Sequence, residues 1–157
     1  MSFSTFSGPI RSGTVREGAG RNTGLAVLAQ SYDTGDLTGT ETGNVDVLAM
    51  YLPKGSQITD ITVDQVVAAT AGTMTISVGN ASGGAQLMAA IASTAGGRFR
   101  GTATAATQLA WQTSTSADTT VYIRVAVGTA TLTAGRAIVT VSYVQRADNG
   151  AQNPVSA

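Results

Sequence analysis

The chain has 157 residues, of which 11% are charged and 5% aromatic, and its formal net charge is zero. This length supports one domain with a hydrophobic core, and a neutral chain has no electrostatic support for general binding to nucleic acid or to an anionic membrane. Because the chain has no cysteine and no histidine, it lacks the thiol nucleophile, the commonest general base and the usual transition-metal ligands, so we expect no metal site, no cofactor and no enzymatic activity.

Residues 1–23 predict an extended arm. Glycines and Pro9 interrupt this stretch, which disfavours a helix, and its apolar residues are too widely spaced for a continuous strand. An arm of this kind becomes ordered against another surface, although a frayed terminus is the alternative. The residues that we expect to make contacts are Phe3, Phe6, Pro9, Ile10, Arg11, Arg16 and Arg21. We see no signal peptide, because the start has neither a basic region nor a continuous apolar segment.

The charges are unevenly distributed along the chain. Residues 1–21 contain three arginines and one acidic residue, whereas residues 32–64 contain six acidic residues and one lysine. Complementary patches between copies and a scatter of solvated charges are both compatible with this distribution.

Residues 24–52 predict one or two strands separated by an acidic loop. Residues 24–31 fit a first strand or a short helix. Residues 32–44 are acidic and rich in glycine, but they lack the order of a calcium-binding loop, so we favour turns over a metal site. Residues 45–52 form the next predicted strand, with one face made by Val45, Val47, Ala49 and Tyr51.

Two runs with strict alternation follow the turn at Pro53. Ile61 and Val63 share a face in the first run, and Met74, Ile76 and Val78 share a face in the second, so we predict a hairpin joined by residues 68–72. The next segment, residues 85–92, has Leu87, Met88 and Ile91 at helix spacing. It is the one helix that we predict, and a strand with a bulge is the alternative.

Residues 95–113 contain the remaining candidate contact residues. Arg98, Phe99 and Arg100 stand between glycines, as in an exposed hairpin tip that presents an aromatic contact. One such triplet in a neutral chain is too little to indicate binding of single-stranded nucleic acid. Trp111 fits a core position best, then the centre of an interface, then a sugar site. Asp60 and Asp64 are a possible glycosidase pair by proximity, but we expect them on a solvent-facing side without the pocket that a general acid requires.

The clearest pattern lies near the C-terminus. Two alternating runs, residues 121–127 and 137–144, flank a glycine-bounded turn and predict a closing antiparallel hairpin. Together the segments predict an all-β protein: an antiparallel β-sandwich or jelly-roll-like domain over residues 24–146, with the extended N-terminal arm 1–23 and a flexible C-terminal tail 147–157.

The chain resembles the small head proteins of tailed bacteriophages that decorate or cement the capsid. The stretches that carry the resemblance are residues 6–14 (FSGPIRSGT), 52–61 (LPKGSQITDI), 75–79 (TISVG), 121–123 (VYI) and 137–143 (AIVTVSY). The resemblance implies a β-sandwich that sits as a trimer, or in some cases a dimer, on the outside of the shell, with arms that reach over capsid subunits or neighbouring copies. The family has no catalytic residues.

This resemblance also implies the partners and the location. We expect the chain to bind the major capsid protein and itself, most simply as a homotrimer, and to bind no nucleic acid, membrane or small-molecule substrate. We expect synthesis in the host bacterial cytoplasm and a final place on the capsid surface of the virion. The alternatives are a tail-fibre or receptor-binding module that recognises carbohydrate through Trp111 or tyrosines, and a tail-tube or connector subunit that assembles into rings.

Overall fold

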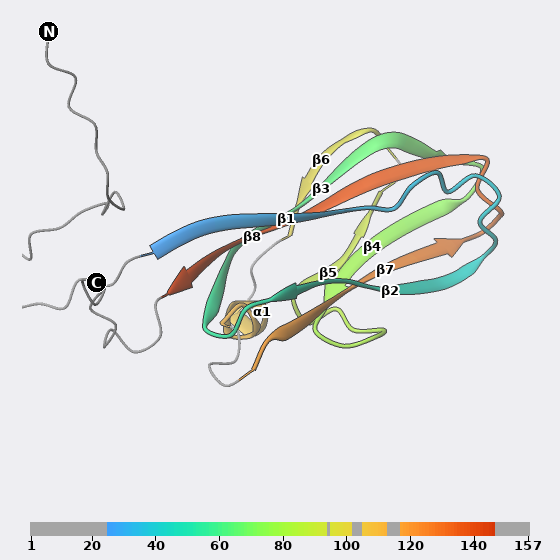
Figure 1. Cartoon of the computed structure of the whole chain (residues 1–157). Coiled ribbons are helices and arrows are strands. Elements are labelled where there is room, and N and C mark those ends of the chain that lie inside the picture. The colour runs from blue at the N-terminus through green and yellow to red at the C-terminus, as the bar shows by residue number, and fades with distance from the viewer. Residues whose placement is uncertain (1–24, 94, 102–104, 113–116, 147–157) are drawn as a thin grey trace, which may run out of the picture.

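The computed structural model describes residues 25–93, 95–101, 105–112 and 117–146, which form strands and one short helix (Figure 1). The strands are β1 (Leu25–Asp33), β2 (Gly43–Leu52), β3 (Ser56–Thr70), β4 (Thr73–Gly79), β5 (Met88–Ala92), β6 (Gly97–Arg100), β7 (Thr119–Gly128) and β8 (Ala134–Arg146), and the helix is α1 (Ala105–Ala110). The prediction of an all-β antiparallel sandwich is confirmed. In the described part of the chain, no helix is long and apolar enough to cross a membrane.

The strands form two four-stranded sheets that face each other. One sheet has the order β1-β8-β3-β6 and the other has the order β2-β7-β4-β5, with every neighbouring pair antiparallel. The pairing is nested: β1 pairs with β8, β2 with β7, β3 with β6 and β4 with β5. The chain therefore runs as one long hairpin wound into two layers (Figure 1).

The core lies between the two sheets and is aliphatic. Alternate residues of the central strands point inward, so the period-two pattern of the sequence becomes the buried face of each sheet. Fully buried positions include Ile61, Val63, Val139 and Val141 in one sheet and Met74, Ile76, Val78, Val121 and Ile123 in the other. Each such side chain contributes about 1.5–3 kcal/mol of transfer free energy relative to an exposed position.

Both predicted hairpins are wrong as hairpins. β3 and β4 lie in opposite sheets, and so do β7 and β8, although each pair is consecutive in the sequence. Their alternating patterns are real, since each strand buries one face. The pattern cannot tell whether two such faces lie side by side in one sheet or opposite each other across a core. Here they lie opposite each other.

Two tight crossovers carry the chain between the sheets at the same end of the sandwich. Ala71 and Thr129 have positive φ values of 70° and 67°, one in each crossover. Thr129 Oγ1 accepts a hydrogen bond from Thr73 N at 3.2 Å, and Thr133 N donates to Thr70 O at 3.1 Å. The two crossovers therefore brace each other.

The predicted helix at residues 85–92 is also wrong, and the bulged-strand alternative describes the region. Met88 pairs with Val78 and Ile91 pairs with Ile76, so three steps along β5 match two steps along β4. This irregularity, together with a buried Leu87 just before the strand, gives apolar residues the spacing of a helix turn. The helix of the described chain, α1, comes directly before Trp111.

β1 and β2 differ from the prediction in detail. The first segment is a strand, not a helix, and it continues through Asp33 into the predicted loop. β2 has a register shift between Leu48 and Met50. Because of this bulge, Met50 and Leu52 point into the core, whereas Tyr51 is 55% exposed and does not share the face of Val45.

Candidate interaction surface

The predicted contact residues at 98–100 lie on the edge strand β6, not at a hairpin tip. Arg98 forms a two-pronged ion pair with Asp64, with Nε to Oδ1 at 2.5 Å and Nη2 to Oδ2 at 3.0 Å, and Arg100 Nε lies 3.7 Å from Asp60 Oδ2. Phe99 is half-buried and packs against the core. Consecutive side chains of a strand alternate between its two faces, so the two arginines face outward and the aromatic ring faces inward.

Asp60 and Asp64 do not form the carboxylate pair of a glycosidase. Each has an arginine partner on β6. The hydrogen bond from Arg98 lowers the pKa of Asp64, which is the opposite of the raised pKa that a general acid needs. The two carboxylates instead tie β6 to β3.

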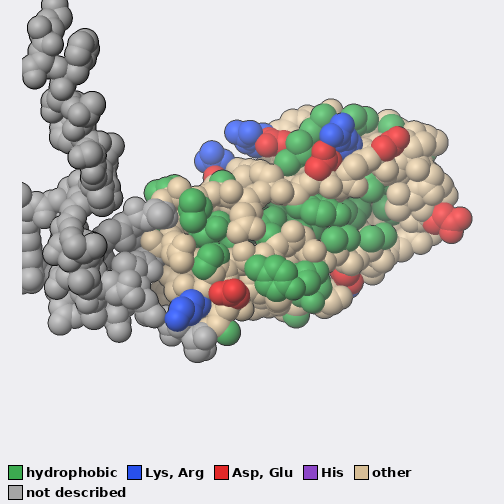
Figure 2. Space-filling view, viewed as in Figure 1, with side chains coloured by type: hydrophobic (Ala, Val, Ile, Leu, Met, Phe, Trp, Pro, Cys, Tyr) green, Lys and Arg blue, Asp and Glu red, His purple; other side chains and the backbone are tan. Residues whose placement is uncertain are grey.

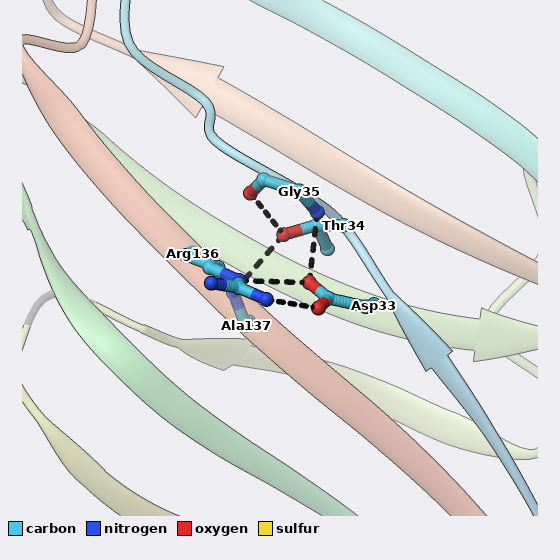
Figure 3. A network of polar contacts seen from close by, with 5 residues as sticks. All are labelled: Asp33, Thr34, Gly35, Arg136 and Ala137. Carbon is cyan, nitrogen blue, oxygen red and sulfur yellow. Dashed lines mark hydrogen bonds and ion pairs between the residues drawn. The ribbon is translucent and has the colours of Figure 1, made fainter.

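The acidic segment after β1 is organised by local hydrogen bonds (Figure 3). Asp33 accepts from Arg136 Nη2 at 2.5 Å and from Gly35 N at 2.9 Å, and Ala137 N donates to Thr34 Oγ1 at 3.0 Å. The hydrogen bonds from Arg136 and Gly35 lower the pKa of Asp33 from 3.8 to about 2. Among the described residues, no group of three or more acidic side chains is arranged to hold a metal ion.

A similar pair neutralises the acidic residue of β2. Arg124 Nε donates to Asp46 Oδ1 at 2.7 Å, and Arg124 Nη2 donates to Asp46 Oδ2 at 3.0 Å. The hydrogen bond from Arg124 lowers the pKa of this carboxyl group. Ion pairs of this kind hold acidic side chains of the outer faces to arginines on neighbouring strands.

Trp111 lies at the margin of the core. Its ring packs against the buried cluster, and its Nε1 donates to Leu87 O at 2.8 Å. Its backbone oxygen accepts from Ile58 N at 2.9 Å. These contacts match the first of the three roles expected for this residue, because a half-buried indole held on both sides joins α1 to the sandwich and is not presented as a sugar platform.

The largest group of exposed apolar side chains lies on β1 and β2, which we call the β1–β2 face. Its members are Val27 (77% exposed), Leu28 (42%), Val45 (48%), Leu48 (40%) and Tyr51 (55%). Figure 2, seen from this side, shows hydrophobic side chains across the middle of the molecule. The other large exposed apolar residues of the described chain are Val66, Val67 and Leu109 on β3 and α1. Because β1 and β2 are edge strands of opposite sheets, these side chains are distributed along one side of the sandwich.

Two members of the β1–β2 face belong to the inner side of their sheets. Leu28 pairs with the buried Tyr143, and Val45 pairs with the buried Val125, so both side chains point toward the gap between the sheets. Both are nevertheless more than 40% exposed. Gln30 spans the gap, since its Nε2 donates to Tyr51 O at 2.9 Å and to Tyr143 Oη at 3.0 Å. The sandwich is therefore less well covered on this side.

The four edge strands differ in how they are protected from pairing with another chain. β5 and β6 have 5 and 4 residues, and β6 presents two arginines. β1 has 9 residues, with no proline and no charge from Leu25 through Tyr32. Short edges and charged side chains prevent edge-to-edge association, whereas a long uncharged edge favours it. β2 has 10 residues and contains Asp46, so β1 is the long edge strand without a charge along most of its length.

The sequence did not point to the β1–β2 face. Its signal is the sequence Ala26-Val27-Leu28-Ala29, in which adjacent apolar residues occupy both faces of a strand. The predicted contact residues of the arm, Phe3, Phe6, Pro9, Ile10, Arg11, Arg16 and Arg21, lie outside the described residues, as does the predicted tail 147–157. Residue 24 directly precedes Leu25, the first residue of β1.

Comparisons with known proteins link this fold to phage capsids. No protein-family model and no curated protein sequence matches the chain. A chain in the capsid structure of Ralstonia phage GP4 matches with a TM-score of 0.58 and 23% identity, over 87% of this chain and 92% of that chain. A chain in the capsid asymmetric unit of cyanophage Pam1 matches with a TM-score of 0.50 and 22% identity, over 86% and 94%. The resemblance to phage head proteins therefore holds at the level of the fold.

Proposed function

We propose that the chain is a structural protein of a bacteriophage virion that binds the outer surface of the capsid as a symmetric oligomer, most simply a homotrimer. In this role it cements adjacent subunits of the major capsid protein. The observation that carries the proposal is a two-sheet fold shared with chains of phage capsid structures over most of their length. The nested strand order supports the jelly-roll-like form of the predicted sandwich, an architecture that viral capsid domains use.

The surface chemistry supports an assembly role. The outer faces carry few charges, and those of Asp33, Asp46 and Asp64 are paired with arginines of neighbouring strands. The β1–β2 face is apolar and its first strand is an open edge. Interfaces are depleted of charge at their centres, so a surface of this kind fits contact with other protein better than free exposure to solvent.

Cementing would follow from repetition of modest contacts. A symmetric oligomer that touches several capsid subunits turns weak single contacts into tight attachment, because each further contact is made at high effective concentration. Bound copies stabilise the assembled shell relative to its separated subunits by mass action. Bridged subunits would then resist the outward pressure of packed DNA.

A receptor-binding module that recognises carbohydrate is less well supported. Trp111 is held at the core margin by its bond to Leu87 O. Among the aromatic residues of the described chain, only Tyr51 is strongly exposed, so no aromatic platform forms there. A tail-tube or connector subunit remains distinguishable by its oligomeric state, because it would form rings.

Two measurements test the proposal. Light scattering on the purified full chain gives its mass in solution, and we expect three times the mass of the 15.8 kDa chain. Co-sedimentation with capsids of the same phage that lack the protein should show saturable binding at a fixed ratio to the major capsid protein. A protein that remains in the supernatant, or one that forms large rings, would contradict the proposal.

A further inference from the structure

We propose that β1 pairs with β1 of a second copy of this chain, antiparallel about a two-fold axis at Ala29, so that the β1-β8-β3-β6 sheets of the two copies become one. The inference goes beyond the proposed capsid binding, because this contact between copies involves neither the capsid nor residues 1–23. Among the described residues, β1 has a strand on one side only, where β8 lies. No charged residue occurs from Leu25 through Tyr32, so this stretch lacks the charges that usually keep the edge strands of two molecules apart.

The backbone groups of β1 alternate between β8 and the open edge. Thr34 N donates to Ala137 O at 2.9 Å, so Thr34 and the residues two, four and six places before it bond to β8. The residues between them, Val27, Ala29 and Ser31, turn their N–H and C=O groups toward the open edge. None of these three is a proline, so each can donate a hydrogen bond as well as accept one. A second strand at this edge would satisfy these groups.

β1 matches itself over its full length when Ala29 lies opposite Ala29 of the second copy. In this register Val27 lies opposite Ser31, and residues with outward-turned backbone groups face one another, as an antiparallel ladder requires. No two carboxylates are brought together, because Asp33 at the end of β1 lies opposite the first residue of the other strand. The charge of Asp33 is also paired with Arg136 of its own chain. The strand is therefore complementary to a second copy of itself.

The pairing would also cover an apolar side chain that the single sandwich leaves exposed. Leu28 lies opposite the buried Tyr143 of β8 and points toward the core side of its sheet, yet it is 42% exposed. In the proposed register, the residue on its other side is Gln30 of the second copy. Gln30 is held on the core side by hydrogen bonds from its Nε2 to Tyr51 O and Tyr143 Oη, so it would contact Leu28 without rearranging.

On a shell, this contact would connect neighbouring oligomers, a consequence that rests on the proposed function. A two-fold contact joins copies in pairs, so each β1 of a trimer would pair with a copy that belongs to the next trimer. One pair of strands is a small contact in dilute solution, but attachment to the same shell raises the effective concentration of the two edges. The bound copies would then form a net, which adds to the contacts that hold the capsid subunits together.

Disulfide formation tests the pairing, because the chain has no native cysteine. In the full chain, Ala29→Cys places identical cysteines at the two-fold axis, where the Cα atoms of a hydrogen-bonded pair lie about 5.5 Å apart, within the range that a disulfide spans. Ala90→Cys on the edge strand β5 is the matched control, since both alanines are exposed. Under mild oxidation in solution, we expect Ala29→Cys to form a two-chain species about tenfold faster than Ala90→Cys, because pairing raises the effective concentration of the thiols. Equal rates would overturn the proposal.

Mixed variants test the register and the charge dependence. Val27→Cys alone and Ser31→Cys alone should give little of the two-chain species, whereas a mixture of the two proteins should form it readily. Adding Ala29→Lys to both proteins should slow this cross-link about fivefold, because like charges then face each other across the axis. Ala29→Lys in one protein and Ala29→Glu in the other should restore it, which separates lost pairing from misfolding. Failure of the opposite charges to restore the cross-link would contradict the pairing.

Capsid binding separates this inference from the proposed function. A protein that forms the cross-link at position 29 but does not bind capsids would contradict only the proposed function. A protein that binds capsids but forms no cross-link at position 29, in solution or on the shell, would overturn only this inference. If Ala29→Lys also weakened capsid binding in that case, the edge would receive a strand of a capsid subunit and not a second copy of this chain.

Discussion

Gly72 occupies the crossover between β3 and β4, where a side chain has no room. A Cβ atom added there would clash with the backbone oxygen of Ala130 in the other crossover and would lie 3.1 Å from Gly128 O at the end of β7. We expect Gly72→Ala to lower the free energy of unfolding by about 1–3 kcal/mol, the usual cost of overpacking. Urea denaturation measures the change.

Gly96 provides the matched control for this substitution. A Cβ atom there would meet only Gln65 O, at 3.9 Å, and its φ is not in the left-handed region. Gly96→Ala should therefore change the stability by less than about 0.5 kcal/mol. Equal effects of the two substitutions would show that the crossovers are not packed as described.

Asp33 links the stability of the sandwich to pH. The hydrogen bonds from Arg136 and Gly35 lower its pKa from 3.8 to about 2 in the folded state. A carboxyl group with a lowered pKa stabilises the fold above its unfolded pKa, and this contribution is lost as the pH falls through the folded pKa. Between about pH 4 and pH 2, stability should fall, and Asp33→Asn should make the fall shallower while lowering stability at pH 7. Parallel pH curves for the two proteins in thermal unfolding would contradict this assignment.

Residue types predicted part of the chemistry but not the pairing of charges. The absence of histidine and cysteine is visible in the sequence and needs no structure. The partners of the acidic residues are not visible, because Asp33 meets Arg136 and Asp46 meets Arg124 only after distant strands pair. The sequence suggested an uneven charge distribution, whereas the structure shows that much of it is neutralised across strands.

At the scale of elements, β2 shows how one extra residue changes which side chains are buried. Because of the bulge at Ala49, Met50 is 6% exposed and Tyr51 is 55% exposed. Met50→Ala should lower the free energy of unfolding by about 2–5 kcal/mol, as expected for truncation of a core side chain. Tyr51→Ala should change it by less than about 1 kcal/mol, because its side chain lies at the surface. A larger loss of stability from Tyr51→Ala than from Met50→Ala in chemical denaturation would contradict the bulge and indicate the regular register.

The strands themselves were predictable where alternation is strict, as in β4 and β7, since one buried face requires it. The strands with which they pair could not be predicted. Two inward-facing strands give the same pattern whether they pair or pack across a core, which is why both predicted hairpins failed. Irregular ladders mislead in another way: the bulged pairing of β5 places Leu87, Met88 and Ile91 at helix spacing.

At the scale of the molecule, the two sides of the sandwich differ in their readiness to bind. One side ends in the short strands β5 and β6, the latter with its two arginines paired to β3. The other side ends in β1 and β2, which are longer and carry exposed apolar side chains. The gap between the sheets is less well covered on that side. This difference between the two sides supports the proposal that the protein functions while bound to other subunits. The alternation of apolar residues predicted the sandwich, but the exposed face depends on which strands become edges, and that is decided by topology.

The measurement that tests the central proposal most directly is the temperature at which full capsids release their DNA. Virions that lack this protein would be heated with a DNA-binding dye, before and after saturation with the purified full chain, and bound protein would be quantified in the sedimented particles. We expect the protein to bind and to raise the release temperature, since bridged subunits must lose additional contacts before the shell opens. An unchanged release temperature with the protein fully bound, or no binding at all, would contradict a cementing role.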